Sequence, residues 1–154
     1  MGFLSKLKNF VTGGGAKVSV EAIEPARGGP FKVRIHAAVA ETDIPIEGVY
    51  LKIASLETVV VKDVEIARQV GEKVEKARQD IEKTTAIHDQ KIEVAGAQTL
   101  KAKEEYDWET TVILPENALP TFIGVTAKHE WKILAGLAVS GNDPDSGWIV
   151  IRLA

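Results

Sequence analysis

Apolar and polar residues alternate with a period of two along most of this chain. The pattern is clearest in residues 17–23 and 31–39, where every second residue is apolar. Successive side chains of a β-strand point to opposite faces, so each segment is expected to be a strand with one buried face. This alternation constrains the chain to a fold built mainly of strands.

Further strands are expected in the rest of the chain, at 48–54 with a continuation at 57–61, and at 91–95, 105–114, 129–139 and 147–153. Segment 129–139 is apolar at nearly every residue, which is typical of a central strand covered on both faces. Turn-forming glycine and proline residues separate the segments. Seven or eight such strands predict an all-β, immunoglobulin-like β-sandwich.

Residues 63–84 show a different periodicity. Apolar residues spaced three and four apart predict an inserted helix there, with Asp63 as its N-cap: Ala67, Val70, Val74, Ala77 and Ile81. The alternation in Val64-Glu65-Ile66 supports a competing structure, a long charged hairpin. The helical spacing is sustained for longer, so the helix is the expectation. Its thin stripe, with Val70 and Val74, would be a seam for a homo-oligomer or a partner.

A short amphipathic helix is expected at residues 1–12, with Phe3, Leu7 and Phe10 on its apolar face. Glycines 13–15 would end it and form a hinge to a single sandwich domain at 16–154. Packing of the helix on the domain or on a partner is favoured over contact with a membrane surface, because the helix is short. The glycines lack the Gly-Lys-Ser/Thr of a phosphate-binding loop.

Composition narrows the functional classes. The 154 residues include no cysteine, which excludes disulfides and cysteine-ligated metal sites and fits a reducing, cytoplasmic setting. The net charge of −3 provides no basic field for a phosphate backbone, so nucleic acid is not an expected partner.

Candidate catalytic groups are scattered. The histidines, His36, His88 and His129, show no metal-binding spacing or triad signature, so no catalytic residue and no cofactor is predicted. The segment 142–147 is rich in oxygen ligands, and Asp143 and Asp145 are its weak metal candidates. Asn, Asp, Pro, Ser and Gly also build tight turns, and a turn is the favoured interpretation.

The three tryptophans all fall on expected strands. Trp108, Trp131 and Trp148 could form a stacking platform for sugars or bases, or they could belong to the core. Trp108 and Trp148 are in phase with the apolar alternation, and no basic stripe accompanies them. A core position is therefore expected for all three.

The order of these features resembles the arrestin-like family, and more closely its small bacterial branch of sporulation-control proteins. The resemblance is carried by the strand 106–114 ending at Pro115, the loop to Leu119-Pro120-Thr121, and the strand 128–135 followed by an aspartate-rich turn. The amphipathic start, the glycines and strand 16–18 add to it. The chain is long enough for one sandwich, where arrestins have two.

The resemblance implies an intracellular adaptor or regulatory domain that binds proteins through strand edges and loops, without catalysis. It identifies neither the protein partner nor a residue-level site. Two alternatives remain open: a peripheral membrane protein that uses the N-terminal helix, and a ligand-binding or catalytic sandwich.

Overall fold

A computed structural model describes residues 15–154 of the chain. All regular secondary structure in this range is β-strand, in ten elements: β1 (Ala16–Ile23), β2 (Pro30–Val39), β3 (Ile44–Ile46), β4 (Gly48–Val70), β5 (Lys73–Ala95), β6 (Gln98–Leu100), β7 (Glu105–Ile113), β8 (Phe122–Ile123), β9 (Ala127–Ala138) and β10 (Ile149–Ile151). The predicted β-sandwich is confirmed.

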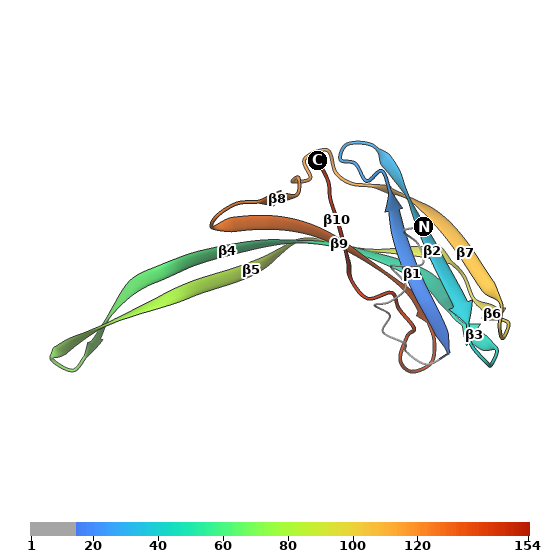
Figure 1. Ribbon diagram of the computed structural model, residues 1–154, viewed down its shortest axis with the longest axis horizontal. Helices are drawn as coiled ribbons and strands as arrows, with labels where there is room; N and C mark the ends of the chain where they lie inside the picture. Colours follow the sequence, from blue (N-terminus) through green and yellow to red (C-terminus); the bar gives the residue numbers. More distant parts are fainter. Residues whose placement is uncertain (1–14) are drawn as a thin grey trace.

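Two antiparallel sheets form the body of the molecule. One has the order β1-β2-β7, and the other has the order β10-β9-β4-β5, with β8 also paired to β9. Strands β3 and β6 form a separate two-stranded ribbon. Figure 1 shows that β4 and β5 run far beyond the other strands, so that a long hairpin projects from one end of the body.

The alternation in the sequence places the core between the two sheets. In β2 the buried side chains are Phe31, Val33, Ile35, Ala37 and Val39, and the intervening residues are more exposed. The facing sheet contributes every second residue of β4 and β9, including the following: Val49, Leu51, Ile53, Trp131, Ile133, Ala135 and Leu137. Burial of these apolar side chains on one face of each strand stabilises the sandwich.

The inserted helix expected over residues 63–84 is wrong. These residues belong to β4 and β5, which pair antiparallel from Val49 opposite Ala95 to Val70 opposite Lys73. The hairpin, which was the competing prediction, is the structure found. The amphipathic helix and hinge expected over residues 1–12 and 13–15 fall outside the described residues, except for Gly15.

Local chemistry explains why the hairpin forms. A two-residue turn, Gly71-Glu72, joins the strands, and Gly71 has a φ of 65°, which favours glycine. In a helix the same glycine would cost about 1 kcal/mol relative to alanine. β-Branched residues are frequent on both sides of the turn, and they favour extended structure.

Three β-bulges or irregularities interrupt the pairing of β4 with β5, and the first lies between Val49 and Tyr50, where Val94 of β5 has no partner. Near the body, Ser55 and Leu56 of β4 lie opposite His88 and Ala86, so that one residue of β5 has no partner. Farther out, Lys62 and Asp63 of β4 lie opposite the single residue Asp80 of β5, so that β4 has one extra residue, and Asp63 has a φ of 57°. Asp63 was the predicted helix N-cap, and it is instead the bulge residue that turns β4.

Tyr50 packs over Gly136 on the outer side of the β4–β9 pair. The two residues lie directly opposite each other, and a Cβ atom on Gly136 would lie 2.3 Å from the Tyr50 hydroxyl oxygen. The phenol ring occupies the space that a side chain at position 136 would need. Glycine is therefore required there by the close approach of the ring.

No helix in the described part of the chain is long and apolar enough to cross a membrane.

Candidate interaction surface

The most distinctive surface of the molecule is the outer part of the β4–β5 hairpin. Strand β9 pairs with β4 only as far as Val59, opposite Ala127. We call residues 60–82, which lie beyond that point, the arm. Every residue of β5 from 73 to 87 is exposed, and Figure 1 shows that the other strands do not cover the tip. A two-stranded ribbon of this length has two faces and two edges available for contact.

The register assigns the side chains of the arm to two faces. Val61 lies opposite Ile81 on the side that continues the sandwich interior, and we call this side the inner face. Strand β5 has no extra residue between 73 and 81, so Ala77, four residues from Ile81, points to the same inner face. Ile66 lies opposite Ala77 and therefore also points to the inner face. Val64 and Val70 lie on the inner face too, opposite Gln79 and Lys73.

A shallow apolar groove lies where the inner face of the arm meets the body, and of its lining residues Val61 and Ile81 belong to the arm. Its volume is about 390 Å³, and its lining comes from three cross-strand pairs: Val59 and Lys83, Val61 and Ile81, and Glu57 and Thr85. The exposed valine and isoleucine side chains here continue the apolar stripe of the sandwich core onto the arm. An exposed apolar strip of this kind is typical of a surface that binds another molecule.

The opposite, outer face of the arm is charged. Arg78 donates a hydrogen bond from Nε to Asp63 Oδ1 at 2.7 Å and lies 3.8 Å from Glu65. Lys76 Nζ lies 3.6 Å from the same Glu65 carboxylate. These exposed cross-strand pairs each contribute a few tenths of a kcal/mol, about 0.2–1, to the stability of the ribbon. The outer face of the arm therefore carries the ion pairs, whereas the inner face carries Val61, Val64, Ile66 and Ile81 together with the charged residues Arg68, Lys73 and Glu75.

The residues predicted to form a self-association seam do not share a face. Val70 lies opposite Lys73 on the inner face, and Val74 lies opposite Gln69 on the outer face. Their side chains are 48% and 63% exposed. A self-association seam that uses Val70 and Val74 together is incompatible with the hairpin, because the two side chains point to opposite faces. The other predicted contact residues, Phe3, Leu7 and Phe10, lie outside the described residues.

The segment 142–147 forms a turn that packs beside β9. Asp143 accepts hydrogen bonds from the Tyr50 hydroxyl at 2.9 Å and from the Val139 amide at 2.9 Å. Asp145 accepts one from the Gly147 amide at 2.8 Å. Both carboxylates are thus held by groups of the protein itself, as in a tight turn. No cluster of three or more metal-ligating side chains occurs within residues 15–154.

Tyr50 is the ionisable group that this turn perturbs most. Its side chain is largely buried, and burial raises the pKa of the Tyr50 phenol well above its usual 10.0. The hydrogen bond to Asp143 and the charges of nearby carboxylates raise this pKa further. Lys91 Nζ lies 4.7 Å from the ring centroid on the exposed side.

We expect Tyr50 to make the protein labile at high pH. The phenol of the unfolded chain ionises near pH 10, whereas the folded phenol stays neutral, so the free energy of unfolding should fall as pH rises above about 10. Tyr50→Phe should lower this free energy by about 1 kcal/mol at pH 7, because the Asp143 hydrogen bond is lost. The difference between the two proteins should narrow above pH 10. Urea titrations at pH 7 and above pH 10 measure the difference in free energy of unfolding between the two proteins. If this difference is the same at both pH values, Tyr50 is not the source of the instability at high pH.

The histidines and tryptophans occupy different environments. On the body, His36 contacts Asp107 through Nδ1 at 2.7 Å, and at the base of the arm the His88 ring lies 5.2 Å from the Trp131 ring. His129 is fully buried, and its Nδ1 donates to the Pro120 carbonyl at 2.8 Å. Its Nε2 has no hydrogen-bond partner among residues 15–154.

The expected core position is correct for Trp131 and wrong for Trp148. Trp131 is 1% exposed and belongs to the core cluster, and Trp108 packs against that cluster while half-buried. Trp148 is 43% exposed, and Lys132 Nζ lies 4.5 Å from its ring centroid. Trp148 precedes the short strand β10 at the edge of its sheet.

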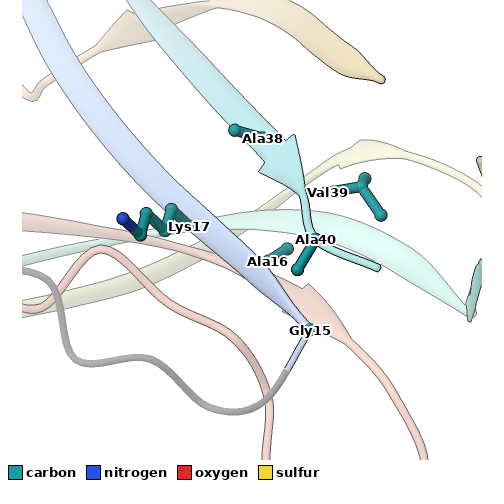
Figure 2. Close-up of a pocket in the computed structure, with 6 residues that line it drawn as sticks. All are labelled: Gly15, Ala16, Lys17, Ala38, Val39 and Ala40. Atoms are coloured by element: carbon teal, nitrogen blue, oxygen red, sulfur yellow. The ribbon is translucent and has the colours of Figure 1, made fainter. Parts of the chain in front are cut away.

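Two other hollows lie on the body. Figure 2 shows the first, about 320 Å³ in volume, where β1 begins and β2 ends; Lys17 is the one titratable residue among its six lining residues. The second, about 300 Å³, lies between β8 and β10 and is lined by Phe122, Ile123 and Val150 together with polar residues. The exposed apolar residues at this edge form a smaller candidate surface.

The inner face was not recognised as a surface from the sequence, because residues 63–84 were assigned to a helix and Val70, Ala77 and Ile81 were placed on its apolar stripe. Two signals could have identified this face. The alternation in Val64-Glu65-Ile66 is typical of a strand, and Gly71 lies near the middle of the segment, where a hairpin turn would fall.

The two sheets form a β-sandwich of arrestin-like fold. A comparison with solved structures finds that the chain is similar in fold to the sporulation control protein Spo0M from Bacillus subtilis. The TM-score is 0.61 and the sequence identity 19%, over 91% of this chain and 49% of that protein. The match confirms the predicted resemblance at the level of the fold, and this chain spans about half the length of its structural neighbour.

The sequence comparisons gave no match. No protein-family model matches the sequence, and no curated protein is similar to it by sequence.

Proposed function

We propose that this chain is a non-enzymatic protein-interaction module of regulatory or adaptor type, and that the arm is its contact surface. The observation that carries the proposal is the extension of β4 and β5 beyond the sandwich, with the apolar groove on the inner face and ion pairs on the outer face. Apolar side chains flanked by charges are suited to a protein partner, because the apolar part contributes affinity and the charges select orientation.

The structural neighbour supports the regulatory half of the proposal. Its name describes a sporulation control protein, and its fold is shared by this chain. Fold similarity alone does not transfer a function, so the arm itself must be tested.

Removal of the arm is the direct test. Val59 and Lys83 lie opposite each other, so residues 60–82 can be replaced by Asn-Gly to give a two-residue hairpin turn. The core residues all lie outside the excised segment, and the sandwich should therefore remain folded. With the full chain as bait in a lysate of its source organism, we expect specific partners whose recovery falls at least about tenfold with the excised chain. Equal recovery by both baits would contradict the proposal.

Paired variants locate the contact on one face. Val61→Lys with Ile81→Lys places charge in the groove of the inner face, and Ala67→Lys with Gln69→Lys adds the same charge on the outer face. We expect the first pair to abolish capture and the second to retain most of it. The reverse result would move the contact surface to the outer face.

A further inference from the structure

The outer edge of β5 is a long, regular and unpaired strand edge. Strand β5 ends the order of its sheet and pairs only with β4 among the described residues. From 73 to 86 β5 has no extra residue of its own, whereas the edge of β4 is covered by β9 up to Val59 and broken by the bulge at Asp63. Unpaired backbone groups on such an edge are a template for another strand. Of the two edges of the arm, β5 is therefore the one able to accept a partner.

The charges along this edge are antisymmetric about Gln79. Moving outward from Gln79 in both directions, Arg78 is matched by Asp80, Lys76 by Glu82, and Glu75 by Lys83. The uncharged Ala77 is matched by Ile81. When a strand pairs antiparallel with its own copy about a two-fold axis, residues at equal distances from the centre lie opposite each other.

We propose that two copies of this chain associate by antiparallel pairing of β5 with β5 of the second copy, with Gln79 on the two-fold axis. In this register, every charged residue of the central segment 75–83 lies opposite a residue of the other sign, and symmetry repeats each pair. Ala77 lies opposite Ile81, so that an exposed apolar side chain is covered on the inner face. The result is a four-stranded sheet formed by the two arms.

Neighbouring registers place like charges together. A shift by one residue puts Lys76 opposite Lys83 in one direction, or Glu75 opposite Glu82 in the other. A shift by two residues puts Asp80 opposite its own copy, or Lys73 opposite Lys83. Like charges directly opposite each other are destabilising, so the charge pattern selects the register centred on Gln79.

The rest of the structure accommodates this pairing. Residues 73–85 of one copy would lie opposite residues 85–73 of the other, which is the part of β5 before its bulge at 87. Strand β9 lies on the far side of β4, and it leaves this edge open. Glu75, Glu82 and Lys83 take part in no ion pair within the described chain, so these charges are available to a second copy.

Complementary charge reversals test the proposal without reference to any other partner. Glu75→Lys and Lys83→Glu each create two like-charge contacts in the dimer, because each change occurs twice. We expect either variant alone to raise the dimer dissociation constant at least about tenfold. An equimolar mixture of the two variants restores opposite charges at both contacts. Light scattering over a dilution series should then show monomers of 16.7 kDa for each variant and twice that mass for the mixture.

The mixture also serves as the internal control. Any effect of a substitution on the hairpin itself persists in the mixture, so recovery of the dimer mass isolates the contact between copies. A wild-type chain that remains at 16.7 kDa throughout the series would overturn the proposal. So would single variants that retain the wild-type mass, or a mixture that stays monomeric.

A cysteine scan fixes the register. The chain has no cysteine, so Gln79→Cys introduces a single thiol on the two-fold axis, where opposite Cα atoms lie about 4.5–5.5 Å apart and can form a disulfide. Ala77→Cys is the matched control, because its copy would lie opposite residue 81. Rapid cross-linking of the first variant and not the second is expected under mild oxidation. Equal cross-linking of both would reject this register.

Discussion

Trp131→Ala should lower the free energy of unfolding by about 3–5 kcal/mol, and the melting temperature by about 10 °C. Trp131 is 1% exposed, and its indole Nε1 donates a hydrogen bond to the Leu119 carbonyl at 2.8 Å. Its ring also makes an edge contact with His129, at a centroid distance of 5.6 Å. The substitution removes a large apolar side chain from between the sheets and leaves the Leu119 carbonyl without its donor.

Trp148→Ala is the matched control, since it makes the same chemical change on the surface. Trp148 is 43% exposed and interacts mainly with the Lys132 ammonium group, a contact of about 0.5–1 kcal/mol. We expect Trp148→Ala to lower the free energy of unfolding by less than about 1 kcal/mol. Urea unfolding followed by circular dichroism measures both variants. Similar costs for the two would contradict the placement of Trp131 in the core.

Gly136→Ala should cost about 2–4 kcal/mol, although it adds one methyl group. The new Cβ would lie 2.3 Å from the Tyr50 hydroxyl oxygen and 2.4 Å from Cζ, so the ring must move. Overpacking of this kind costs about 1–3 kcal/mol. Displacement of the ring also breaks its hydrogen bond to Asp143, which adds about 1 kcal/mol.

A double-mutant cycle separates this steric effect from any other role of Gly136. In a Tyr50→Val background the ring is absent, and Gly136→Ala should then be neutral or slightly stabilising, because glycine weakens the interior of a strand. The expected coupling is about 2 kcal/mol or more. A cost that is unchanged in the Tyr50→Val background would show that the ring is not the cause.

The body of the fold could be predicted from the sequence because its strands obey a local rule. Residues 31–39 alternate between buried and exposed positions in the structure as they alternate in the sequence, and the β-sandwich follows from several such segments. Burial of one face is a property of each strand by itself. The choice of pairing partner is not a property of a single strand. Strand β2, for example, pairs with β7, some 70 residues away in the chain.

The arm could not be assigned by the same rule. Its apolar residues are few and are shared between two faces, so the spacing of Val70, Val74 and Ala77 matches a helix by coincidence. In the hairpin these residues do not act together: Val70 and Ala77 lie on the inner face and Val74 on the outer face. Spacing along one strand carries no information about the cross-strand neighbours that define a ribbon.

The candidate residues on the body show the same limit. Asp143 and Asp145 were correctly placed in a turn, but the contact between Asp143 and Tyr50 joins residues 93 positions apart in the chain. The full burial of His129 depends on Pro120 and Phe122, which fold back over it. Such contacts are set by the tertiary fold, and the sequence near each residue does not indicate them.

The β4–β5 hairpin also shortens the search that the chain must make in order to fold. Val39 at the end of β2 and Glu105 at the start of β7 are separated by 66 residues along the chain. Once the local turn at Gly71 has closed the hairpin and brought Val49 opposite Ala95, the remaining path between β2 and β7 is about 20 residues. The entropy cost of joining these strands then falls by about 1 kcal/mol. A projection that contributes little to the core thus makes the most distant pairing in the sandwich a more local event.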